Sequence, residues 1–410
     1  MRKPHGVVDR FPIHPKWVAL LLAIPLLTLS LLLVGALGPL KPHRHSPSDL
    51  ERSSGYERLP KPPRLAYMIS GTRGDVRRVK RLLQAVYHPW NFYLIHLDFA
   101  SSPEERADLA SYTASDATFL EFDNVRIVKE ANPVSSKGAT VIACTLHAVA
   151  ILLREFEDWS WFINLSAADY PLMPQDDILH VFSYLRRDFN FIKHTSDIGW
   201  REYERARPIV VDPGFHRSSK TEVFWAKEKR SMPSAFKIFA GSSRMILARP
   251  FLEFCISGWD NLPRTLLMYY TNFLSSSEGY FHTVICNSKD FQNTTINDDL
   301  RFMVCDNPPR LHPMNLTSEH FSLMVESGAP FAHSFAEDSV LERIDRELLQ
   351  RSIDQFTPGG WCLGNPLVPK DPCSVYGRPS VIRPSVNSRR LETLLVKLLD
   401  PDNFRPRQCI

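Results

Sequence analysis

Short apolar segments alternate with segments of helical periodicity between residues 65 and 193, and this alternation constrains the fold more than any other feature. It predicts an α/β fold with a mostly parallel central sheet and helices on both faces. The expected strands are Leu65–Ser70, Phe92–Asp98, Val125–Val128, Trp159–Leu165 and Phe189–Lys193, and the expected helices are Val76–Val86, Pro103–Ser115, Gly138–Arg154 and Asp176–Arg187.

The second half of the chain is less regular. A strand is expected at Phe239–Leu247, a helix at Phe251–Trp259 and a further strand at Leu300–Val304, followed by a Pro-rich tail from Pro358 to Pro406. The basic residues of this tail either form a solvated face or supply cations to a pyrophosphate.

Ligands of parallel α/β sheets bind beyond the carboxyl ends of the strands. This rule selects the loops Gly71–Asp75, His96–Asp98 and Ser166–Tyr170 as a crevice that suits a nucleotide-sugar. Each loop taken alone is equally compatible with a plain connection. The turn after the first strand is not G-x-G-x-x-G, so a dinucleotide fold is not supported.

A lone carboxylate, Glu278, follows three serines and precedes an aromatic run. The segment Tyr280–Ile285 is typical of the start of a buried helix or strand that would fix this carboxylate in place. One positioned carboxylate can act as the general base that activates an alcohol. The alternative is an ordinary surface glutamate that caps a helix.

The N-terminal region contains an uncharged apolar run, Trp17–Gly38, of 22 residues. This length is sufficient for a transmembrane helix. The basic residues in segment 1–16 favour a cytoplasmic tail and a lumenal bulk. A cleaved signal peptide is the alternative, but the run is too long and lacks a clean Ala-x-Ala site.

Residues 39–63 are rich in Pro, Ser, His and charge, and they are expected to form a flexible stem. A short tail, one membrane helix and a stem before a large domain, here 64–410, are the layout of a type II Golgi membrane enzyme. The net charge of +4 is too small to indicate a nucleic-acid partner.

All seven cysteines lie beyond the apolar run, where a lumenal setting permits disulfides. Their spacings form no zinc pattern. Cys286 and Cys305 are expected to pair if their flanking segments form strands. Among the sequons, Asn293 and Asn315 are predicted glycosylation sites, whereas Asn164 lies in an apolar strand and is not expected to be used.

Several motifs together resemble glycosyltransferase family 14, the core-2 and I-branching enzyme family, over about residues 64–409. Among its members they are most similar to the plant β-glucuronosyltransferases of arabinogalactan proteins. The motifs, in matching order, are Tyr67–Asp75, Tyr93–Asp98, Phe162–Pro171, Ser277–Thr283, Gly359–Cys362, Cys373–Gly377 and Asn403–Cys409.

The resemblance implies a GT-A type fold, a UDP-sugar donor and inversion at the sugar carbon, with Glu278 as the base. It implies that two basic residues near the C-terminus replace a metal at the UDP pyrophosphate. These align with Lys370 and Lys397, with Arg378, Arg389 and Arg390 as nearby substitutes. No metal cofactor is expected, since the one Asp-x-Asp triplet, Asp400–Asp402, lies in a turn context.

As a mechanistic hypothesis, further residues are expected to have roles in the site. Asp98 would hydrogen-bond the uridine or ribose, and Gly71, Thr72 and Arg73 would line the nucleotide pocket. Asp169 would orient the donor or acceptor sugar. The resemblance also implies a disulfide between Cys362 and Cys373.

The chain departs from the family pattern in two places. It has His333-Ser334 where plant members usually carry Arg-Lys, so two positive charges are missing. No cysteine precedes Cys144, so Cys409 must pair differently from its counterpart in the branching enzymes or stay free.

The leading functional hypothesis is transfer of glucuronic acid from UDP-glucuronic acid to the β-linked galactan of arabinogalactan proteins. An acidic donor favours a basic pocket, for which Lys137, Arg244 and Lys237 are candidates. The alternatives are a β-1,6-N-acetylglucosaminyl- or xylosyltransferase, and a catalytically weak Golgi scaffold that partners other Golgi glycosyltransferases.

Overall fold

The computed structural model describes residues 60–199, 202–216, 222–305, 313–365 and 370–410. The predicted tail, membrane anchor and nearly all of the predicted stem lie outside the described residues. Within the described ranges, no helix has both the length and the apolar character needed to cross a membrane.

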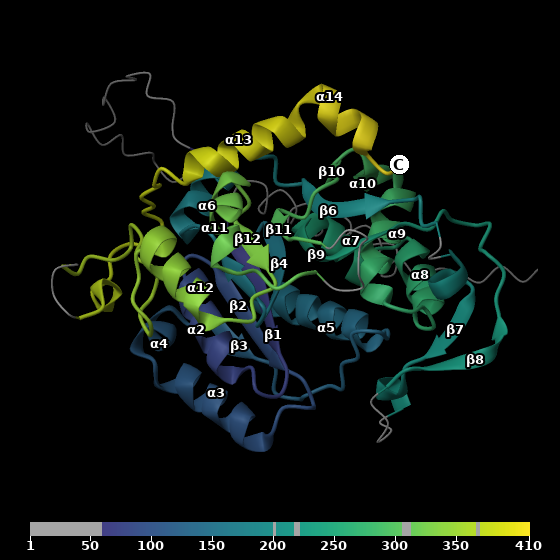
Figure 1. Ribbon diagram of the computed structural model, residues 1–410, viewed down its shortest axis with the longest axis horizontal. Helices are drawn as coiled ribbons and strands as arrows, with labels where there is room; N and C mark the ends of the chain where they lie inside the picture. Colours follow the sequence, from purple (N-terminus) through teal and green to yellow (C-terminus); the bar gives the residue numbers. More distant parts are fainter. Residues whose placement is uncertain (1–59, 200–201, 217–221, 306–312, 366–369) are drawn as a thin grey trace, which may run out of the picture. The chain divides into compact units, whose positions relative to one another are not determined.

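A seven-stranded sheet forms the centre of the described domain, with the strand order β10-β6-β9-β4-β1-β2-β3 (Figure 1). Neighbouring strands are parallel, except that β9 runs antiparallel to both β4 and β6. The predicted mostly parallel sheet is therefore confirmed. Its strands are β1 (Leu65–Gly71), β2 (Phe92–Leu97), β3 (Val125–Ile127), β4 (Trp161–Ser166), β6 (Asn190–Thr195), β9 (Ala240–Ala248) and β10 (Thr295–Ile296).

Helices cover both faces of this sheet because successive side chains of a strand point to opposite sides. Tyr67 of β1 packs in one core, whereas its neighbours Ala66 and Met68 pack in the other. The Tyr67 side carries α2 (Val76–Val86), α3 (Pro103–Ser115), α4 (Ala117–Phe122), α6 (Gln175–Ser183), α11 (Phe321–Glu326), α12 (Asp338–Ile344) and α13 (Ser388–Leu399). The Met68 side carries α5 (Thr140–Glu155), α7 (Arg249–Ser257), α8 (Leu262–Tyr270) and α9 (Tyr280–Asn287).

Helix boundaries follow the sequence where local signals are strong. Helices α2 and α3 have the predicted bounds, and Ser102 begins α3 with a capping box to Glu105. Helix α6 ends at Ser183, four residues earlier than expected. The Pro-rich tail contains the twelve-residue helix α13, which was not expected from the sequence. In Figure 1, α13 runs beside α6, and α14 (Pro401–Phe404) follows it.

A second, three-stranded sheet joins segments that are far apart in the chain, in the order β11-β12-β5. It consists of β5 (Asp169–Pro171), β11 (Arg301–Phe302) and β12 (Phe331–His333). Only β11 falls within a predicted strand, and it is shorter than the expected Leu300–Val304. A two-stranded sheet of β7 (Pro208–Val211) and β8 (Phe224–Lys229) and the short helix α10 (Lys289–Gln292) complete these elements.

Two disulfides are present in the described residues, Cys362–Cys373 and Cys286–Cys409. The first agrees with the pairing implied by the family resemblance. The expected Cys286–Cys305 pair is wrong, because Cys286 lies on helix α9 rather than on a strand that could pair beside Cys305. Cys286 instead ties the C-terminal Cys409 to α9.

Candidate active site

A cavity of about 510 Å³ opens where β1, β2 and β4 end, on the Met68 side of the central sheet. All three loops selected by the strand-end rule contribute to its lining. Glu278 reaches the same cavity from a distant part of the sequence. Of the residues predicted to bind the donor, orient the sugars or act as the base, those that line it are Gly71, Thr72, Asp98, Asp169 and Glu278.

Glu278 ends a short 3-10 turn that directly precedes α9. The turn is fixed to the segment before α5, since Ser275 N donates to the Lys137 carbonyl at 2.8 Å and Ser276 Oγ donates to the Gly138 carbonyl at 2.7 Å. At Gly279, a Cβ atom would lie 2.6 Å from the ring of Tyr270, so only glycine fits there. Because α9 is buried from Tyr280 to Cys286, the predicted buried element after Glu278 is confirmed.

An ion pair with Arg205 holds the Glu278 carboxylate. Arg205 Nη1 lies 2.5 Å from Glu278 Oε2, and the two side chains are 8% and 35% exposed. No described residue bonds to Oε1, so this oxygen is available to a ligand in the cavity. Arg205 comes from the turn Glu202–Ala206, and no local sequence signal connects it to Glu278.

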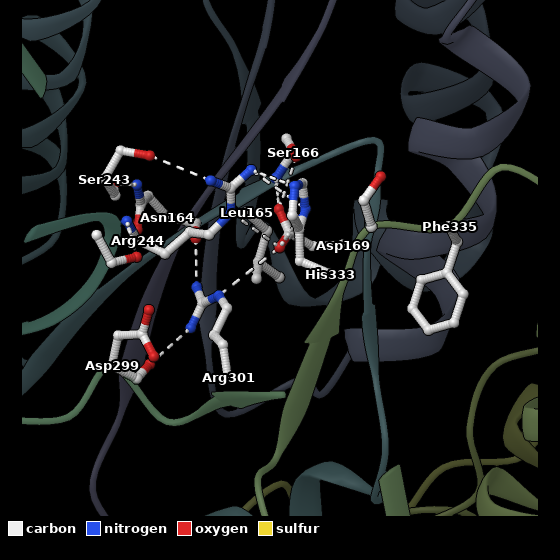
Figure 2. A network of polar contacts seen from close by, with 12 residues as sticks. Asn164, Leu165, Ser166, Asp169, Ser243, Arg244, Asp299, Arg301, His333 and Phe335 are labelled. Atoms are coloured by element: carbon white, nitrogen blue, oxygen red, sulfur yellow. Dashed lines mark hydrogen bonds and ion pairs between the residues drawn. The ribbon is translucent and has the colours of Figure 1, made fainter. Parts of the chain in front are cut away.

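Asp169 lies at the centre of a polar network assembled from four chain segments (Figure 2). Its Oδ2 accepts hydrogen bonds from Ser166 N at 2.7 Å and from Ser166 Oγ at 2.6 Å. Its Oδ1 lies 3.5 Å from Arg244 Nε, 3.7 Å from Arg301 Nε and 3.3 Å from His333 Nδ1. The small sheet creates this arrangement, because His333 of β12 stands directly opposite Asp169 of β5.

The network keeps Asp169 ionised although its carboxyl group is buried. Burial alone would raise the pKa of Asp169. The charge of Arg244, the close contact and charge of His333, and the charge of Arg301 more than offset burial, so the pKa of Asp169 is lowered well below its usual range. Asp169 is therefore a fixed negative charge beside the cavity.

His333 is the residue at which the chain departs from the plant pattern, and it lines the cavity. Both of its ring nitrogens lie close to Arg244 Nη2, at 3.1 and 2.8 Å. The adjacent Ser334 is outside the lining and donates to Asn315 Oδ1 at 3.2 Å. Of the two residues that depart from the family pattern, His333 therefore lies at the site, whereas Ser334 lies outside the cavity lining.

Three of the predicted donor-binding residues lie outside the cavity lining. Arg73 is exposed, and its Nε donates to the Ala100 carbonyl at 2.9 Å. Lys397 projects from α13, whose Leu391 and Leu395 pack on the opposite face of the central sheet. Lys370 is exposed beside Cys373, which belongs to that same opposite core. Neither Lys370 nor Lys397 therefore lines the cavity, and their positions in the sequence gave no information about the face on which α13 packs.

Other cations line the cavity instead. Within the part of the chain that the structure describes, these are Lys137, Arg205 and Arg244. The hypothesis of a basic pocket had named Lys137 and Arg244, and both are present in it. Lys237 is not, since its Nζ lies over the ring of Phe239, 5.4 Å from the ring centroid.

The predicted glycosylation sites Asn293 and Asn315 are both exposed. Asn164 is engaged in the sheet, where its Nδ2 donates to the Ser243 carbonyl and its Oδ1 accepts from Met245 N, each at 2.9 Å. Its side chain is thus committed to joining β4 to β9.

Possible metal ligands gather at one place in the described ranges, at His194, Cys286 and Cys409. The two cysteines form a disulfide there, so they offer no thiolate. The triplet Asp400–Asp402 lies at the start of α14, where Asp400 Oδ1 accepts from Asp402 N at 2.9 Å. Metal independence stays a prediction.

Comparison with known proteins places the chain in a family. The model of the Core-2/I-Branching enzyme family matches residues 65–325. The chain is 59% identical over 347 residues to β-glucuronosyltransferase GlcAT14B of Arabidopsis thaliana, which covers 84% of this chain and 80% of that protein. It is 55% identical over 352 residues to GlcAT14A of the same organism, over 86% of this chain and 79% of that protein.

The chain therefore belongs to the Core-2/I-Branching enzyme family. Among solved structures, mouse xyloside xylosyltransferase 1 matches with a TM-score of 0.31 and 10% identity, over 66% of this chain and 97% of that one. That similarity is too low to bear on the fold. The α/β architecture rests on the sheet order and register described above.

Proposed function

We propose that this protein is an inverting glycosyltransferase of the GT-A type that transfers glucuronic acid from UDP-glucuronic acid to the β-linked galactan of arabinogalactan proteins. One observation carries the proposal. Glu278, Asp98 and Asp169 line a single cavity at the ends of the parallel strands, in a chain that is 59% identical to a β-glucuronosyltransferase.

Glu278 is the general base in this mechanism. Its Oε1 takes the proton of an acceptor galactose hydroxyl while the hydroxyl oxygen attacks the anomeric carbon of the donor. The bond from that carbon to the diphosphate breaks, and UDP leaves from the opposite face, which inverts the configuration. Arg205 fixes the carboxylate through Oε2, so the proton-accepting oxygen keeps one position.

The nucleotide is assigned to the β1 and β2 ends of the cavity. The Gly71–Asp75 turn lines this part, and Asp75 Oδ2 accepts from Thr72 N at 2.9 Å, which fixes the turn. Asp98 Oδ1 accepts from Ala100 N at 3.0 Å, leaving Oδ2 for the uridine or ribose. Lys137 is a cation of the lining that can approach the departing diphosphate.

The cellular setting is part of the proposal. The apolar segment 17–38 would anchor the protein in the Golgi membrane, with residues 1–16 cytoplasmic and the catalytic domain lumenal. Segment 39–63 would act as the stem, and Asn293 and Asn315 would carry glycans. Other Golgi glycosyltransferases are candidate partners. The reaction would need no metal cofactor.

A transfer assay tests the function. Residues 60–410, which form one compact unit, would be offered UDP-glucuronic acid, UDP-N-acetylglucosamine and UDP-xylose with β-1,3- and β-1,6-galactan oligomers. Parallel reactions would contain EDTA or manganese. We expect glucuronic acid transfer in EDTA. Preferred transfer of N-acetylglucosamine or xylose would contradict the donor assignment, and activity with manganese alone would contradict metal independence.

A substitution of Glu278 tests its assignment as the general base. Glu278→Gln should lower turnover by about 10²–10⁴-fold, the usual contribution of general-base assistance. Affinity for UDP should stay unchanged, because the amide keeps the shape of the side chain. Near-normal turnover of this variant would exclude Glu278 as the base.

A catalytically weak Golgi scaffold is the second candidate. The observation that favours it is His333 in the cavity lining, where plant members usually carry arginine. Such a protein would bind UDP but transfer no sugar to any galactan oligomer in the same assay.

A further inference from the structure

The three cations that line the described cavity differ in how far their hydrogen-bonding groups are already used. Arg205 is committed to Glu278. Lys137 is exposed at the segment that carries the Glu278 turn. Arg244 is more enclosed than Lys137, since only 22% of its side chain is exposed.

The Arg244 guanidinium has donors without strong acceptors. Its Nη1 donates to Ser243 Oγ at 3.1 Å, and its Nη2 faces the His333 ring. Its Nε is buried, and within the described chain no atom accepts a hydrogen bond from it, since Asp169 Oδ1 lies 3.5 Å away. A buried donor without an acceptor costs free energy, so the geometry favours an added acceptor group at this guanidinium.

The single negative charge of Asp169 does not fully neutralise Arg244, because Asp169 Oδ1 also faces the positive charge of Arg301. Arg301 is buried outside the lining, donates to the Asn164 carbonyl at 2.5 Å and is flanked by Asp299. Asp169 therefore fixes Arg244 in place while its own hydrogen bonds come from Ser166. Figure 2 shows Arg244 placed between Ser243 and the Asp169–His333 pair.

The strand order assigns Arg244 to the sugar end of a bound donor. The nucleotide loops follow β1 and β2, Asp169 follows β4, and Arg244 lies on β9, the next strand along. Adjacent strands are about 4.8 Å apart, so β9 lies roughly 10 Å from β1. A donor laid across these strands runs from nucleoside through diphosphate to sugar.

We propose that Arg244 binds the carboxylate of the donor sugar and thereby selects a hexuronic acid over a neutral hexose. This inference rests on the proposed function. The planar guanidinium matches a carboxylate with two parallel N–H···O bonds, which a sugar hydroxymethyl group cannot accept in the same way.

Calorimetric binding of UDP, UDP-glucose and UDP-glucuronic acid to the 60–410 unit tests the proposal. In Arg244→Gln, affinity for UDP-glucuronic acid should fall about 10- to 100-fold, the usual effect of losing charged hydrogen bonds. Affinities for UDP and UDP-glucose should change less than about twofold. Lys237→Gln is the matched control, because Lys237 lies outside the cavity lining, and its three affinities should equal those of the wild type.

Equal losses for all three ligands in Arg244→Gln would overturn the proposal, since they would indicate a diphosphate contact or damage to the site. Unchanged affinities would also overturn it. If Arg244→Gln does not fold, Arg244→Lys keeps the charge but not the planar fork, and it should lose affinity for UDP-glucuronic acid alone. A loss in that variant shared by all three ligands would overturn the proposal as well.

The wild type separates this inference from the proposed function. If wild-type protein shows no preference for UDP-glucuronic acid over UDP-glucose, the donor assignment itself is wrong. If the wild type prefers UDP-glucuronic acid and Arg244→Gln keeps that preference, only the role of Arg244 is wrong.

Discussion

Two adjacent residues of β5, Asp169 and Tyr170, enter two buried polar networks of different character. Tyr170 donates to Asp345 Oδ1 at 2.6 Å, and Asp345 also accepts from Arg351 Nη1 at 2.9 Å and from Arg81 Nη2 at 2.9 Å. Asp169 instead faces Arg244, Arg301 and His333 at longer distances (Figure 2). Strand alternation sends the two neighbouring side chains to opposite sides.

The difference lies in how completely each carboxylate and its arginines are satisfied. Both oxygens of Asp345 accept short hydrogen bonds from arginine, and no part of that network lines the described cavity. Asp169 Oδ1, Arg244 Nε and Arg301 Nε have no hydrogen-bond partner in the described chain. Buried charges are tolerated when they are paired, so a closed network indicates a structural role and an incomplete one at a cavity indicates a ligand.

The matched substitutions Asp345→Asn and Asp169→Asn should give the largest contrast. Asp345→Asn leaves Arg81 and Arg351 buried without their counter-charge, and it should lower the free energy of unfolding by about 3–5 kcal/mol. Asp169→Asn keeps an acceptor for Ser166, and Asp299 still provides a negative charge beside Arg301, so this substitution should cost less. Urea denaturation of both variants measures this, and an equal loss in both would remove the distinction between the networks.

For catalytic activity we expect the opposite order, with a larger loss in Asp169→Asn than in Asp345→Asn. Asp169→Asn should reduce kcat/KM about 10- to 100-fold, because the charge that holds Arg244 beside the donor is lost. Any Asp345→Asn protein that remains folded should have kcat/KM close to the wild-type value. Donor titrations at a temperature where both variants are folded test this, and full activity of Asp169→Asn would assign it a structural role.

The pH dependence of stability should separate the wild type from Asp169→Asn. The pKa of Asp169 is lowered in the folded state, so its contribution to stability is fully present above its unfolded pKa of about 4 and decreases as the pH falls toward the folded pKa. The difference in unfolding free energy between the two proteins should therefore be constant from pH 7 to about pH 5 and shrink below about pH 4. A difference that grows at low pH would contradict the lowered pKa.

The smallest effects should come from the hydroxyl groups that bond to each carboxylate. Tyr170→Phe should cost about 1 kcal/mol of unfolding free energy and leave donor binding unchanged. Ser166→Ala should cost a similar amount, but it should also weaken donor binding severalfold because Ser166 Oγ orients Asp169. Thermal denaturation and UDP-glucuronic acid titrations distinguish them, and weaker donor binding by Tyr170→Phe would mean that the two networks are coupled.

Local pattern was sufficient for much of the fold. The apolar runs and helical spacing from Leu65 to Ser115 predicted β1, α2, β2 and α3 almost to the residue, because each signal is contained within a few turns of chain. The expectation that Cys286 pairs with Cys305 failed, since a residue's sequence neighbours do not determine which distant cysteine it meets. Helix α13 was missed because it lies within a Pro-rich tail.

The sequence by itself determined the α/β class, the three loops at the strand ends and the carboxylate Glu278 before a buried element. Only the tertiary structure decided which cations serve the site. It brought Arg205 to Glu278 across 73 residues and Arg244 to His333 across 89 residues, while α13 carried Lys397 to the opposite face. The physical reason is that strand order and helix packing, which depend on the whole core, determine which distant side chains meet at the cavity.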